Sequence, residues 1–184
     1  MSILPNETQT PRMQLERQYA TARFDLLLLI AFTVINLLML VSQTFTYFLF
    51  SANLPYFLVD LGMYFGGVYA NVDPALMEAG YGILGHGFFY GMLAVAILIV
   101  CVYFVCWLLS ANGRSGFLLA ALVLFGIDTV LMVGMTLLGL SDPSIDFVID
   151  VAFHAYVLYA LSLGVRAAYR LKQPAPVEES APAL

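Results

Sequence analysis

Four long apolar stretches dominate this sequence and limit the folds that it can adopt. They cover residues 24–50, 82–110, 116–140 and 145–168, and each is long enough for the roughly 20 residues that a helix needs to cross a bilayer. Only 10% of the residues are charged, whereas soluble domains carry about 25%. We therefore predict an all-α integral membrane protein, a bundle of four transmembrane helices with the lipid bilayer as its first partner.

The basic residues predict the orientation of this bundle, because Lys and Arg are retained on the cytoplasmic side of a membrane. All seven fall on one side of a four-span topology: Arg12, Arg17, Arg23, Arg114, Arg166, Arg170 and Lys172. The other side carries Asp60, Asp73, Glu78 and Asp142 and no basic residue. We expect both termini in the cytoplasm, with a bacterial plasma membrane as the default location.

The spans divide the chain into three parts. Residues 1–23 form a cytoplasmic N-terminal segment, residues 24–170 the transmembrane domain, and residues 171–184 a Pro-rich, disordered cytoplasmic tail. Residues 51–81, between the first two spans, are too short and too polar to cross the bilayer and return, and residues 52–70 form their interfacial segment. We expect an amphipathic helix lying in the outer interface, with its tyrosines at headgroup depth. A re-entrant segment packed against the bundle is the alternative.

Polar residues inside the spans are the candidate functional residues, since a charge at the centre of a membrane helix costs about 2.5–3.5 kcal/mol. Asp146, Asp150 and His154 recur every four residues and so share one face of the fourth span. The remaining candidates come from the other three spans: Asn36 and Gln43 from the first, His86 from the second and Asp128 from the third.

The expected depths of these residues suggest a pocket. Counted from the outer ends of the spans, His86 lies about 6 Å deep, Asp150 about 8 Å, Gln43 about 10 Å and His154 about 13 Å. Asp128 lies near the midplane, about 18 Å deep, and Asn36 lies slightly deeper. If these faces point inward, they line a polar pocket that opens to the outer side, with Asp128 and Asn36 at its floor.

Polar residues arranged in this way are compatible with three kinds of protein. The leading hypothesis is a small membrane protein that binds or translocates a cation, a proton or a small polar solute through Asp128, Asp150, His154 and His86. A non-catalytic accessory subunit of a larger membrane complex is the second, in which the same residues only join the helices by hydrogen bonds. The third is a metal-dependent membrane enzyme with His86, His154 and Asp150 as ligands of a divalent metal.

The composition also bears on cofactors and partners. The sequence has no cofactor-binding motif, so we predict no cofactor other than the divalent metal of the third hypothesis. It also has no run of basic residues, so we predict no nucleic-acid partner. Four helices form a thin wall around a path, which favours a homo-oligomer or a larger membrane partner. The glycine pairs Gly62/Gly66 and Gly87/Gly91 are candidate contact surfaces, since small residues let helices approach closely.

One short motif suggests an enzyme. The residues Gly113-Arg114-Ser115-Gly116 resemble the nucleophile pattern of rhomboid-type intramembrane proteases, with His154 as the corresponding base. Rhomboids, however, have at least six spans. The basic residues also place Ser115 at the cytoplasmic surface, about 20 Å from His154 along the bundle axis. A nucleophile and its base must come within about 3 Å of each other. The motif is therefore predicted to be a cytoplasmic turn.

Overall fold

The computed structural model describes residues 11–44, 50–70, 72, 75, 77, 80–139 and 145–173. This part of the chain is helical apart from its connections, with α1 at Pro11–Val41, α2 at Asn53–Gly66, α4 at His86–Leu109, the short 3-10 helix η1 at Ala111–Gly113, α5 at Ser115–Leu137 and α6 at Ile145–Leu171. Helices α1, α4, α5 and α6 are long and apolar enough to cross a membrane. The predicted all-α membrane bundle of four long helices is confirmed.

The first span differs most from its predicted bounds. Helix α1 begins at Pro11, so the N-terminal segment continues into the span without a break, and it ends at Val41 rather than near residue 50. Gln43 then has a φ of 55°, a left-handed conformation that does not continue a helix. Residues 1–10, the connection at residues 140–144 between the third and fourth spans, and the tail from residue 174 lie outside the described residues.

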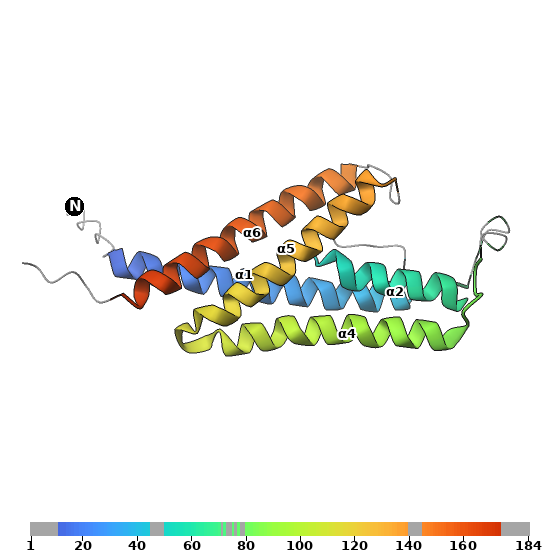
Figure 1. Cartoon of the computed structure of the whole chain (residues 1–184), viewed down its shortest axis with the longest axis horizontal. Helices are drawn as coiled ribbons and strands as arrows, with labels where there is room; N and C mark the ends of the chain where they lie inside the picture. The colour runs from blue at the N-terminus through green and yellow to red at the C-terminus, as the bar shows by residue number, and fades with distance from the viewer. Residues whose placement is uncertain are drawn as a thin grey trace, which may run out of the picture.

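The helices form two groups (Figure 1). Helices α1, α2 and α4 run lengthwise beside one another, while α5 and α6 form an antiparallel pair that crosses them obliquely. The beginning of α1, the α4–α5 connection and the end of α6 all lie at the left end of the figure. The seven basic residues belong to the parts of the chain that lie toward this end.

Helix α2 begins in the middle of the bundle. It packs mainly on α4 and also on α1, and its first turn lies at the level of Asp128 on α5. Its 14 residues span about 21 Å, which is less than the roughly 30 Å of a hydrocarbon core. The helix expected within residues 52–70 is therefore present. However, it lies lengthwise, as in the re-entrant alternative, rather than across the end of the bundle.

Glycines allow the closest helix contacts. A Cβ atom at Gly62 would lie 2.8 Å from Cβ of Met92, and one at Gly164 would lie 2.3 Å from Cβ of Ala22. Gly62 thus brings α2 against α4, and Gly164 brings α6 against α1. A Cβ atom at Gly87 or Gly91, in contrast, would have no neighbouring atom within 4 Å among the described residues. This second glycine pair therefore forms no close helix contact within the described part of the chain.

Two apolar clusters fill the bundle on either side of a polar layer. One cluster joins α1, α4, α5 and α6 around Leu26, Phe125 and Leu161. The other joins α1, α2 and α4 around Val59 and Met63. Between them lie buried polar side chains from four segments: Thr33, Asn36, Ser51, Asp128 and His154. This layer is where the candidate site lies.

Candidate functional site

Asp128 caps the first turn of α2. The N-cap residue of this helix is Ala52, which offers no side-chain acceptor to the free N–H groups of the first turn. The carboxylate of Asp128 provides the acceptors instead: Oδ2 accepts from the backbone N–H of Asn53 at 3.0 Å, and Oδ1 accepts from the backbone N–H of Leu54 at 2.6 Å. A negative group at a helix N-terminus is also stabilised by the helix dipole. The start of α2 therefore depends on a residue of α5.

His154 of α6 contacts the same carboxylate. Its Nε2 lies 3.1 Å from Oδ2 of Asp128, and its Nδ1 lies 2.8 Å from the backbone oxygen of Asp150. Both side chains are almost completely enclosed, with 1% of His154 and 2% of Asp128 exposed. The ring of Phe125 stacks on the imidazole at 4.7 Å with an interplanar angle of 9°. The imidazole is thus held by two polar contacts and one aromatic face.

The hydrogen bonds determine how many protons this pair needs. A carbonyl oxygen only accepts, so Nδ1 of His154 carries a hydrogen. A neutral imidazole has only one N–H, so Nε2 would then present a lone pair to an oxygen of Asp128. One further proton turns this contact into a hydrogen bond. The Asp128–His154 pair is therefore complete with one shared proton and repulsive without it.

The pair has few other polar neighbours. Asp150, one helical turn before His154, is half-buried, and the buried Tyr103 of α4 interacts electrostatically with Asp128. From α1, the facing polar side chains are Thr33 and Asn36, neither of which titrates. Asp150 and Tyr103 are therefore titratable neighbours of the pair.

Thr33 and Asn36 hold the segment that leads into α2. Oγ1 of Thr33 accepts from the backbone N–H of Ala52 at 2.9 Å, and Nδ2 of Asn36 donates to Oγ of Ser51 at 2.7 Å. Asn36 is among the candidate residues predicted from the sequence, whereas Ser51 is not. A helix that starts after Ala52 without a local cap was the available signal that this segment needs distant partners.

The segment around Ser51 and the first turn of α2 occupies the place of the predicted pocket. Asp128 and Asn36 both contact this segment. Gln43 lies beyond the end of α1, where it donates to the backbone oxygen of Val68 at 3.1 Å and accepts from Ala70 N at 2.8 Å. It therefore fastens the end of α1 to the connection after α2.

The predicted metal ligands are not brought together. His86 is the exposed first residue of α4, whereas His154 and Asp150 lie on α6, which packs on α1 and α5. Within the described ranges, no group of three or more His, Cys, Asp or Glu side chains is placed to hold a metal ion. Asp146 is likewise exposed in the first turn of α6.

The structure also shows the contacts of Ser115 in the protease-like motif. Ser115 is buried as the first residue of α5, and its Oγ accepts from Nζ of Lys172 at 2.9 Å. Both ring nitrogens of His154 are engaged with Asp128 and Asp150. Ser115 therefore joins the end of α6 to the start of α5 and has no histidine base.

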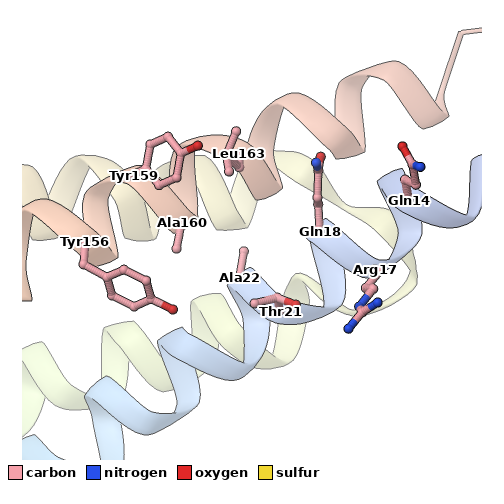
Figure 2. A pocket seen from close by; sticks show the side chains of 9 residues that line it. All are labelled: Gln14, Arg17, Gln18, Thr21, Ala22, Tyr156, Tyr159, Ala160 and Leu163. Carbon is pink, nitrogen blue, oxygen red and sulfur yellow. The ribbon is translucent and has the colours of Figure 1, made fainter. Parts of the chain in front are cut away.

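Two cavities follow the seam between α1 and α6, on the other side of the polar layer from α2. The first, of about 380 Å³, has a partly polar lining, which Figure 2 shows as rows of side chains from the two helices: Gln14, Arg17, Gln18, Thr21 and Ala22 from α1, and Tyr156, Tyr159, Ala160 and Leu163 from α6. The second, of about 280 Å³, shares Tyr156 and is mostly apolar: Asp25, Leu28, Phe32, Phe50, Phe153 and Val157 line the rest of it. Neither is lined by Asp128 or His154.

Comparison with known proteins adds no family to this description. No protein-family model matches the chain, and no curated protein or solved structure matches it either.

Proposed function

We propose that this chain is a proton-responsive membrane protein in which the Asp128–His154 pair binds one proton and thereby controls the start of α2. The observation that supports it is the hydrogen bonding of His154. With Nδ1 committed to a backbone carbonyl, the contact between Nε2 and Asp128 requires one proton. Proton binding is one of the activities expected from the polar residues of the spans, and the first turn of α2 is the element that it would affect.

The mechanism follows from the hydrogen bonds that each protonation state allows. With the proton present, Asp128 as a carboxylate accepts from His154 and from two backbone N–H groups of α2. Loss of the proton leaves a buried carboxylate facing an imidazole lone pair, which is costly in a low-dielectric interior. Separation of α6 from Asp128, or entry of water at the start of α2, relieves this repulsion. Proton binding and the position of α2 are therefore coupled.

The membrane orientation is part of this proposal. The beginning of α1, the α4–α5 connection and the end of α6 share one end of the bundle, which supports a cytoplasmic position for both termini. Asp128 then lies about 20 Å from the cytoplasmic start of α5 at Ser115 and about 14 Å from its outer end at Leu137. Assembly into a homo-oligomer or with a larger partner stays a prediction.

The test follows the protonation of His154 directly. Because the chain has two histidines, His86→Gln leaves His154 as the sole imidazole. Nitrogen NMR of the labelled full chain in lipid nanodiscs should show one protonation step at Nε2 and none at Nδ1. Hydrogen exchange of the Asn53 and Leu54 amides should change in the same pH range.

A purely structural pair gives a different result. In that case the imidazole keeps one state over the whole pH range in which the protein stays folded, and the proposal is wrong. It is also wrong if His154 titrates while the exchange of both amides stays constant. Asp128→Asn is the matched variant, and it should abolish the coupling between the two signals.

A further inference from the structure

The two cavities along the α1–α6 seam have an amphipathic profile. The first is lined at its far end by Gln14, Arg17 and Thr21, whereas the second is lined mainly by Leu28, Phe32 and other apolar side chains. Tyr156 lines both, so the cavities adjoin. Polar groups at one end and hydrocarbon at the other match an amphiphile rather than a soluble metabolite.

The length of this seam corresponds to one leaflet of a membrane. Arg17 and Phe32 are 15 positions apart on the continuous helix α1, which is about 22 Å. Half of a bilayer with its headgroup region is also roughly 20–22 Å thick. Phe32 is followed by Thr33, a buried residue of the polar layer, and the same layer contains Asp128 from the middle part of α5. Arg17 therefore lies at headgroup depth when Phe32 lies near the midplane.

The charge at the polar end selects the headgroup. Arg12 pairs with Glu16 at 3.3 Å, but Arg17 forms no ion pair with any residue in the described part of the chain. Deeper in the seam, the carboxyl of Asp25 interacts with Tyr156, and its buried Oδ2 has no hydrogen-bond partner among the described residues. A phosphate gains nothing from this acceptor-rich carboxyl, so an anionic headgroup stays at the level of Arg17 and Thr21.

We propose that the α1–α6 seam binds an anionic phospholipid of the cytoplasmic leaflet, with its phosphate at Arg17 and one acyl chain in the cavity between Leu28, Phe32 and Phe153. This site is independent of the proton at Asp128 and His154. It goes beyond general solvation by lipid because it predicts one preferred headgroup at one seam.

Fluorescence quenching tests the position and the headgroup together. Trp107 is the only tryptophan, so Leu28→Trp in a Trp107→Phe background places a single fluorophore in the deeper cavity. The full-length variant is reconstituted in phosphatidylcholine vesicles that contain a minor fraction of lipid with brominated chains. Brominated phosphatidylglycerol should quench this tryptophan at an about five-fold lower fraction than brominated phosphatidylcholine, as expected for the attraction of one arginine to a lipid with a net negative charge, because the choline group of phosphatidylcholine neutralises its phosphate.

Two arginine variants serve as a matched pair. Arg17→Gln should remove the preference for phosphatidylglycerol, while Arg12→Gln makes the same charge change nearby and should preserve it. Equal quenching by both lipids overturns the proposal. So does a preference that survives Arg17→Gln or disappears equally in both variants, since general surface charge would then explain it.

Discussion

The backbone N–H of Leu54 donates to Oδ1 of Asp128 at 2.6 Å, although the two residues are 74 positions apart in the chain. This hydrogen bond and its neighbour at Asn53 replace the local cap that α2 lacks. The carboxylate of one membrane helix thus fixes where a second helix begins, and His154 of a third helix shares that carboxylate. The first two predictions concern this junction.

Asp128→Asn should destabilise the bundle. An amide has only one acceptor oxygen. If its NH₂ group donates to the lone pair on Nε2 of His154, it takes the place of Oδ2 and leaves the backbone N–H of Asn53 without an acceptor. Leaving buried donors unsatisfied costs about 1–3 kcal/mol. The free energy of unfolding in detergent measures this loss. Asp146→Asn makes the same change at an exposed position and should stay within about 0.5 kcal/mol of wild type. Equal effects of both substitutions would contradict the capping role.

His154→Phe should cost more than Asp128→Asn. Phenylalanine can keep the stacking on Phe125, but it leaves the buried carboxylate without its partner, which typically costs about 3–5 kcal/mol. In the double variant Asp128→Asn/His154→Phe, the buried negative charge of Asp128 is removed together with its partner. Its loss of unfolding free energy should be smaller than the sum of the single losses by about 0.5–3 kcal/mol. Additive losses would show that the two side chains are not energetically coupled.

Gly164→Ala should separate α6 from α1. The added Cβ would lie 2.3 Å from Cβ of Ala22, a distance that requires the two backbones to shift. We expect a loss of about 1–3 kcal/mol, as for overpacked cores. Gly126→Ala is the matched control within another long helix, because its Cβ position has no atom within 4 Å in the described structure beyond its chain neighbours and the adjacent backbone of its own helix. It should be neutral or slightly stabilising, since alanine favours helix.

Tyr69 should make the fold sensitive to alkaline pH. Burial and the hydrogen bond that its hydroxyl donates to Oδ1 of Asp60 raise the pKa of Tyr69 above its ordinary value. Above about pH 10 the unfolded chain releases this proton while the folded chain retains it, so the stability falls as the pH rises. Tyr69→Phe should reduce this alkaline decline in unfolding free energy, and Asp60→Asn should reduce it partly. An unchanged decline in Tyr69→Phe would contradict the assignment.

Residues 53–66 show how far a sequence-based prediction reaches. A helix between the first two spans was expected, and its apolar character and tyrosines indicated contact with the membrane or bundle. Its lengthwise position depends on Gly62 meeting Met92 of α4 and on the cap from Asp128. Both are contacts between residues far apart in the chain, so no local pattern could favour them over a helix lying in the interface.

The residues of the candidate site could be predicted from the sequence, but their contacts could not. Hydrophobicity and spacing identified Asp128, His154 and Asn36 as polar residues deep inside the spans, because such residues are costly there. Hydrophobicity and spacing did not reveal which of these side chains would contact one another. The structure joins Asp128 to His154, gives Asn36 to Ser51, uses Gln43 at the end of α1 and leaves His86 exposed.

The sequence alone determined the all-α class and the number of long apolar helices, because the length and hydropathy of each span are local properties of the chain. Only the tertiary structure decided that α2 begins inside the bundle and that Asp128 and His154 share one contact. The reason is physical: a cap, a proton-sharing pair and a glycine contact each need two surfaces, and their match depends on the relative rotation of the helices, which no local sequence pattern specifies.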